Sequence, residues 1–235
     1  MEKFDLIYHF FKLTLKGTPA PPGTPWPLPR QILQIEQQFQ LISSEFNFTV
    51  NDLGDCSIVK DATNRYNRIL FPCERFSSKA KPSPAFRLNG QKQLQSLEIQ
   101  VKNGQDCGYP HSKMDESYEL RISDQSPDPK AVLLANSVWG ALRGLETFSQ
   151  LVYTQEFIKG QTNCVYRVNA STILDQPAYS HRGLMLDTSR HFLPLSTILA
   201  HLDAMAYNKL NVRIDTALII IFFPSNSITN YRHFT

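Results

Sequence analysis

With 235 residues, of which 42% are hydrophobic, the chain is long enough to bury the core of one large domain, or of one domain and part of another. Its 24 basic and 21 acidic residues give a net charge of +3 without a basic run, which does not indicate nucleic-acid binding. The longest apolar run, 217–223, is far shorter than the roughly 20 residues of a membrane helix.

Residues 1–23 are predicted to form a degenerate leader or a linker. Asp5 and His9 interrupt the first apolar stretch, so this stretch makes a poor signal peptide. The segment 17–30 is rich in proline and has no hydrophobic period, which indicates an extended lead-in to the first domain.

Other features favour a secreted protein that binds no cofactor. Asn47 and Asn169 each begin an N-glycosylation sequon. The cysteines have no CxxC spacing, so they favour disulfides or buried thiols over a zinc site. The sequence also has no glycine-rich nucleotide motif, and we therefore predict neither a metal nor a cofactor.

Residues 24–175 predict an α+β domain, a sheet with helices on one face. Alternating apolar residues indicate half-buried strands near 46–50, 97–101 and 118–122. A helical period indicates helices over 56–71 and 137–152, the second with Ser137 as its N-cap. Strands and helices in this order, without an internal repeat, are typical of α+β domains.

A second unit is predicted after Pro177. The apolar run "GLMLD" indicates a buried parallel strand, a helix follows over about 196–209, and "LNVRID" indicates the next strand. A single strand–helix–strand unit of this kind begins either a Rossmann-type sheet or a barrel, and the pattern alone does not choose between them.

Arg182 is the candidate binding residue at the start of this unit. The neighbouring Gly183 has no side chain, so a ligand could approach the guanidinium closely. A guanidinium presents five donors in a rigid fork that suits vicinal hydroxyls or a carboxylate. The structural alternative, an ion pair with Asp187 or another acid, is the one that physical reasoning alone favours.

Three long motifs resemble one enzyme family. The stretch "HRGLMLDTSRHFLPLSTILAHLDAMAYNKLNV" (181–212) is similar to the first strand and helix of the catalytic barrel in lysosomal β-N-acetylhexosaminidases, glycoside hydrolase family 20. The stretch "VWGALRGLETFSQLVY" (138–153) resembles a helix of their N-terminal domain, and "WPLP" (26–29) resembles their mature start. The stretches "DESYEL" and "LDAMAYNK" are closer to the β-type than to the α-type subunit.

The resemblance implies an α+β domain over 24–175, followed over 178–212 by the first unit of an incomplete (β/α)8 TIM barrel. It implies a lysosomal or secretory glycosidase that removes terminal N-acetylhexosamine from glycoconjugates by substrate-assisted retaining hydrolysis, with other hexosaminidase subunits as possible partners. Arg182 would hold hydroxyls of the terminal sugar. A disulfide between Cys56 and Cys107 is implied as well, whereas Cys73 and Cys164 have no counterpart that we can place.

The sequence departs from the family after Val212. The family's catalytic Asp-Glu pair, at the end of a later barrel strand, is not among these residues, and Asp115–Glu116 lies in the first domain on a different motif. The alternative interpretation is therefore a truncated, non-catalytic isoform or fragment, an inert or subunit-interacting N-terminal domain, with residues 213–235 as a divergent tail.

Three expectations follow for the isolated chain. It should hydrolyse no hexosaminide. Its segment after about residue 178 should be poorly ordered and cut by proteases, since one strand and one helix leave strand edges unpaired. Asn169 should be glycosylated, because it precedes the domain boundary in a polar segment, and Asn47 less so, because its strand should pack closely.

Overall fold

The computed structural model describes residues 20–51, 53, 56–72, 90–104, 107–124, 128–155 and 164–215. Most of the predicted leader, most of the tail and Cys73 lie outside these ranges. The described elements are β1 (Gln31–Leu41), β2 (Asn47–Val50), α2 (Ile58–Leu70), β3 (Ser96–Val101), β4 (Tyr118–Asp124), β5 (Pro129–Ala135), α4 (Val138–Leu151), β6 (Tyr153–Gln155), β7 (Val165–Asp175), β8 (Gly183–Leu186), α5 (Leu195–Tyr207) and β9 (Val212–Asp215).

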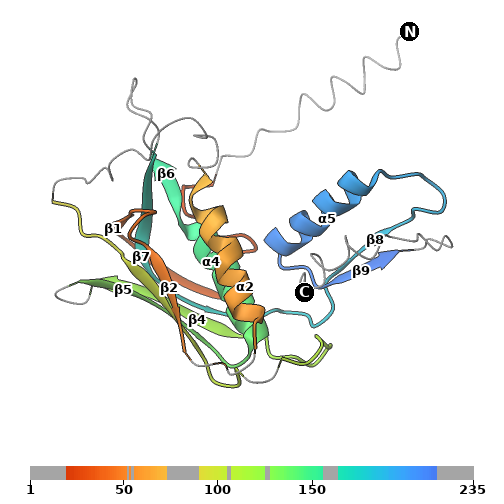
Figure 1. Cartoon of the computed structure of the whole chain (residues 1–235), viewed down its shortest axis with the longest axis horizontal. Coiled ribbons are helices and arrows are strands. Elements are labelled where there is room, and N and C mark those ends of the chain that lie inside the picture. Colours follow the sequence, from red (N-terminus) through yellow and green to blue (C-terminus); the bar gives the residue numbers. More distant parts are fainter. Residues whose placement is uncertain are drawn as a thin grey trace, which may run out of the picture.

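The first part of the chain forms a mixed sheet with two helices on one face (Figure 1). The strand order is β1-β7-β4-β5-β3-β2, and β6 pairs with β7 outside this path. Strand β3 lies parallel to both β2 and β5, whereas β7 is antiparallel to β1, β4 and β6. The mixed sheet and its one-sided helices confirm the coarse prediction for this region.

Helix α4 packs against the sheet at very short range. Ser137 accepts hydrogen bonds from the backbone N–H groups of Trp139 and Gly140, as predicted for the N-cap. A Cβ atom on Gly140 would clash with the Ser117 carbonyl, and one on Gly144 would clash with the Leu133 side chain. The two glycines therefore let the helix approach β4 and β5 closely.

Strands β1, β5, β6 and β7 were not predicted from the sequence. Only the end of β1 is fully buried, and Leu33 and Ile35 on this strand are more than half exposed, so β1 shows no simple alternation. Its register also shifts between Gln34 and Gln38. Strand β7 carries the polar sequon residues of Asn169 among buried apolar ones, which conceals its period of two.

The second part of the chain forms the predicted strand–helix–strand unit. Strands β8 and β9 pair in parallel, and α5 connects them. Ile198 and Met205 are buried on α5, whereas Met185 on β8 is 59% exposed. The prediction of a fully buried first strand is therefore wrong, because in the described part of the chain β8 has β9 as its one strand partner and no barrel closes around it.

Lys209 attaches this unit to the first domain. Its ammonium group donates to the hydroxyl oxygens of Tyr118 (3.0 Å) and Thr147 (2.7 Å) and to Asp175 (3.2 Å), and the Tyr118 hydroxyl donates to Asp175 as well (2.9 Å). Burial lowers the pKa of Lys209, and the attraction of Asp175 only partly opposes this shift.

Lys209 also has an unusual backbone conformation. It lies just after α5 with φ at +55°, the left-handed region in which helices commonly end on glycine. A residue with a Cβ pays about 1–2 kcal/mol for this conformation. The buried contacts of the ammonium group account for a lysine at this position.

The polar face of α4 completes the attachment. Arg143, Glu146 and Thr147 lie at helical spacing and are at most 7% exposed. Glu146 accepts hydrogen bonds from the Tyr66 hydroxyl (2.7 Å) and the Gln150 amide (2.8 Å), and Gln150 also donates to the carbonyl of Tyr207. One face of α4 therefore meets the sheet, while its charged face supports the second unit.

We define the charge cluster as Glu116, Glu146, Asp175, Arg143, Arg182 and Lys209. Three carboxylates and three cations balance one another, so the cluster is neutral when all six are ionised. Figure 1 shows the β8–α5–β9 unit on the far side of α4 from the sheet. Ion pairs of Arg182 with Glu116 and of Lys209 with Asp175 link this unit to the first domain, and the expected cleavage after about residue 178 stays a prediction.

A disulfide joins Cys56, before α2, to Cys107, which follows β3, and Cys164 is disulfide-bonded too. We predict that replacing Cys56 and Cys107 together by serine lowers the free energy of unfolding by about 4 kcal/mol, because the bond spans 51 residues. Urea unfolding followed by the fluorescence of the two tryptophans measures the loss. The single variant Cys56→Ser should lose the same amount, and a double variant within about 1 kcal/mol of the wild type would contradict the prediction.

The lowered pKa of Lys209 predicts a pH dependence of stability. Between the folded-state pKa and the unfolded value of 10.5, the unfolded chain binds more protons, so raising the pH stabilises the folded wild type. The variant Lys209→Met lacks this titration. The difference in melting temperature between wild type and variant should therefore grow in favour of the wild type as the pH rises toward the unfolded value of 10.5. A difference that stays constant or shrinks would refute the assignment.

Candidate functional site

Arg182 lies just before β8 and is held by both parts of the chain. Its side chain is 15% exposed. The guanidinium donates from Nε to the carbonyl of Lys209 (2.9 Å), from Nη1 to the carbonyl of Tyr179 (2.6 Å), and from Nη2 to Glu116 (2.6 Å). Its backbone N–H donates to the side-chain oxygen of Asn211 (2.9 Å).

The acid that pairs with Arg182 is Glu116 and not Asp187, so the ion pair expected with Asp187 or another acid forms with another acid. Asp187 instead accepts hydrogen bonds from the Ser189 hydroxyl (2.8 Å) and the Arg190 backbone (3.1 Å) in the turn after β8. Glu116 was set aside in the sequence because its Asp-Glu dipeptide lies in another domain. The sequence could predict only that a buried arginine pairs with a carboxylate from elsewhere in the fold, and not that this carboxylate is Glu116.

The guanidinium keeps part of its donor capacity. Of its five N–H groups, three donate to acceptors in the described part of the chain, which leaves one N–H on each terminal nitrogen. Two N–H groups on adjacent nitrogens can donate to two neighbouring oxygens, such as vicinal hydroxyls. The structure therefore contains an ion-paired arginine with two N–H groups beyond those that its described contacts use.

The sequons lie at different depths in the sheet. Asn47 is exposed at the first residue of the edge strand β2, while its neighbours Phe46 and Phe48 pack on the core. Asn169 lies inside β7 and not in a loop, and its side-chain oxygen accepts a hydrogen bond from the Tyr153 hydroxyl (3.0 Å). Its neighbours Val168 and Ala170 are buried on the helix side, so alternation directs Asn169 to the open face of the sheet.

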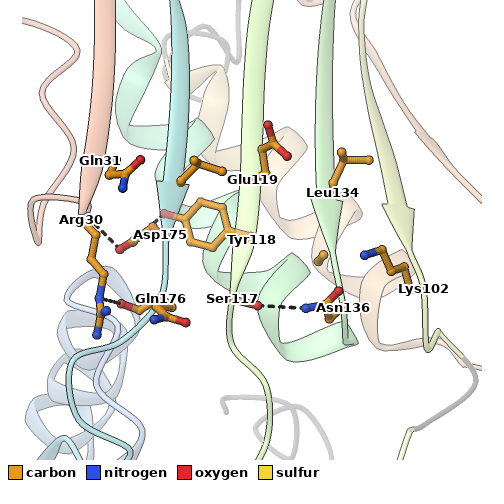
Figure 2. A pocket seen from close by; sticks show the side chains of 12 residues that line it. Arg30, Gln31, Lys102, Ser117, Tyr118, Glu119, Leu134, Asn136, Asp175 and Gln176 are labelled. Atoms are coloured by element: carbon orange, nitrogen blue, oxygen red, sulfur yellow. Dashed lines mark hydrogen bonds between the residues drawn. The ribbon is translucent and has the colours of Figure 1, made fainter.

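A cavity of about 430 Å³ opens at one end of the sheet. Figure 2 shows Arg30, Gln31 and Gln176 on one side of it and Asn136 and Lys102 on the other. Its lining mixes cations, carboxylates and amides and does not include Arg182. The cavity is therefore separate from the arginine that the sequence motif singles out.

Family comparisons identify both parts of the chain. A model described as beta-acetyl hexosaminidase like matches residues 25–151, and the glycosyl hydrolase family 20 catalytic domain matches residues 179–213. No helix in the described ranges is long and apolar enough to cross a membrane.

Curated relatives carry the same assignment. The beta-hexosaminidase subunit beta of Mus musculus is 41% identical over 80% of this chain and 33% of its own length. The Homo sapiens subunit beta is 38% identical over 89% of this chain and 36% of its own length, and the Mus musculus subunit alpha is 37% identical over 80% and 34%. The chain thus spans about a third of the length of these relatives.

Solved structures share the fold. The chitobiase of Flavobacterium johnsoniae is 29% identical with a TM-score of 0.58, over 82% of this chain and 26% of that protein. A Vibrio harveyi exo beta-N-acetylglucosaminidase of family 20 is 19% identical with a TM-score of 0.56, over 84% and 26%, and its likeness concerns the fold alone. The matched domains, the relatives and the geometry agree: this chain belongs to the glycoside hydrolase family 20 β-hexosaminidases and contains their N-terminal domain and the start of their catalytic domain.

Proposed function

We propose that this chain carries the N-terminal domain of a β-N-acetylhexosaminidase and the first part of its sugar-binding site. In this proposal residues 24–175 form the N-terminal domain and residues 178–212 the first unit of a (β/α)8 barrel. The observation that carries it is Arg182, which lies at the start of the matched catalytic region with one N–H left on each terminal nitrogen.

The role of Arg182 would be to hold two hydroxyls of a terminal N-acetylhexosamine. Neutral hydroxyl acceptors each contribute about 0.5–1.5 kcal/mol net, so two such bonds give weak binding once the cost of association is counted. In the family, hydrolysis proceeds by attack of the sugar's own acetamido oxygen, with an Asp that orients this group and a Glu as general acid. The 235-residue sequence has one Asp-Glu dipeptide, and its Glu116 is held in ion pairs with two arginines.

We also propose that the protein enters the secretory pathway and reaches the lysosome or the outside of the cell. The Cys56–Cys107 disulfide and the two sequons suit an oxidising compartment, and terminal N-acetylhexosamine on glycoconjugates would be the substrate of the complete enzyme. Association with other hexosaminidase subunits is proposed on the basis of the relatives, which are named as subunits.

We predict that the purified chain binds N-acetylglucosamine weakly through Arg182 but releases no fluorophore from a fluorogenic N-acetylglucosaminide. Titration with N-acetylglucosamine should shift the NMR resonance of the Arg182 Nε–H group. Arg121, an exposed arginine paired with Glu119, is the matched control and should not shift. A silent Arg182 resonance would contradict the proposed binding role, and turnover by the chain alone would contradict the predicted lack of catalysis.

We predict that secretory cells attach a glycan to Asn169, since its side chain faces the open side of the sheet. Enzymatic removal of N-glycans should increase the electrophoretic mobility of the secreted chain. The variant Asn169→Gln should show a smaller change, and Asn47→Gln reports separately on the exposed sequon of β2. A mobility change that Asn169→Gln leaves intact would rule out this site.

A further inference from the structure

We propose that Glu116 is a positioning residue: the N-terminal domain uses it to orient the Arg182 guanidinium toward a ligand. This proposal deepens the proposed function and rests on it for the identity of the ligand. The orientation of Arg182 itself is a property of the chain without sugar.

The position of Glu116 is fixed from the first domain. Its carboxylate, 4% exposed, accepts a hydrogen bond from Nε of Arg143 on α4 at 2.7 Å. On the preceding residue, Asp115 accepts from the backbone of Ser117 (2.8 Å) and from the Asn136 amide (2.9 Å), and the Asp115 carbonyl accepts from Ser137, the N-cap of α4. The backbone around Glu116 is thus tied to the start of α4 independently of Arg182.

Arg182 meets this fixed carboxylate from the other part of the chain. Its Nη2 donates to the same Oε1 atom of Glu116 that Arg143 uses. The Lys209 carbonyl fixes its Nε, and the ammonium group of that same Lys209 is anchored between Tyr118 and Asp175. Both ends of the guanidinium are therefore set by contacts that lead back to the first domain.

The shared carboxylate has an electrostatic consequence. One carboxylate serves two guanidinium groups, and the positive charge of this Glu116–Arg143–Arg182 trio is balanced by the other three members of the charge cluster. The side chain of Arg143 is 9% exposed and that of Arg182 is 15% exposed, and Arg182 is the one with a donor left on each terminal nitrogen. Arg182 is therefore the arginine of the trio that can still donate charge-assisted hydrogen bonds to ligand oxygens.

The experiment uses the full chain and the variant Glu116→Gln. Glutamine keeps the shape and an acceptor oxygen but removes the charge that both arginines share. The matched control is Glu119→Gln, whose carboxylate pairs with the exposed Arg121. The readout is exchange with water of the Arg182 Nε hydrogen, measured by NMR, with the amide resonances of β3 and β5 as a check of folding.

We expect Glu116→Gln to accelerate exchange at Arg182 about tenfold, the effect of losing one charge-assisted hydrogen bond, while Glu119→Gln leaves it unchanged. A folded Glu116→Gln variant with wild-type exchange at Arg182 would overturn the proposal. If Glu116→Gln does not fold, Asn136→Ala loosens the turn around Glu116 while keeping all three charges, and unchanged exchange in that variant would also overturn it.

A second readout separates positioning from a general loss of stability. N-acetylglucosamine should shift the Arg182 resonance of the wild type and of Glu119→Gln at the same sugar concentration. The same shift in Glu116→Gln should require about a tenfold higher sugar concentration. An equal response in Glu116→Gln would refute positioning. If the wild type itself does not respond, the sugar-binding role of Arg182 fails, and the exchange measurement still decides the role of Glu116.

Discussion

The structure depends on six buried or partly buried charged side chains where α4 meets the second part of the chain. Removing one partner of a buried ion pair lowers the free energy of unfolding by about 3–5 kcal/mol, so each of these groups is stable in its place only when its partner is present. Glu116, Glu146 and Asp175 belong to the first domain together with Arg143, whereas Arg182 and Lys209 come from the second unit. The first domain alone therefore carries a surplus of two negative charges at this surface, and the second unit supplies the two cations that neutralise them.

This constraint explains why a short strand–helix–strand unit has a defined place. Its apolar contacts are modest, because Met185 and Ile214 on the small sheet are 59% and 46% exposed. Apolar burial gives no preferred direction, whereas hydrogen-bonded ion pairs do. The pairs at Arg182 and Lys209 fix both the beginning of β8 and the end of α5, and so they orient the whole unit.

Much of the first domain could be predicted from local patterns. The periods of α2, α4, β3 and β4 are clear in the sequence, and Ser137 is a recognisable N-cap. The strands β1 and β7 were missed because a register shift and a polar sequon conceal their alternation. The parallel β8–α5–β9 unit was predicted, since its elements are short and contiguous.

The site was harder to predict than the fold. The family motif singled out Arg182, but its partner Glu116 lies 66 residues earlier. In the sequence, Glu116 was considered only as part of an Asp-Glu dipeptide that could be compared with the family's catalytic pair. On α4, Arg143 and Glu146 resemble the solvent face of an amphipathic helix, and nothing local distinguishes a solvated charge from one that a distant segment covers. Charge pairing across the fold is a tertiary property, whereas periodicity is a local one.

The central claim is that buried charge pairing joins the two parts of the chain, and a double-mutant cycle tests it most directly. The cycle measures the free energy of unfolding of the wild type, Glu116→Ala, Arg182→Ala and the double variant, beside the same cycle for the exposed pair of Glu119 and Arg121. We predict a coupling energy of about 1–3 kcal/mol for the buried pair and less than about 1 kcal/mol for the exposed one. A buried pair whose coupling equals that of the exposed pair would contradict the account.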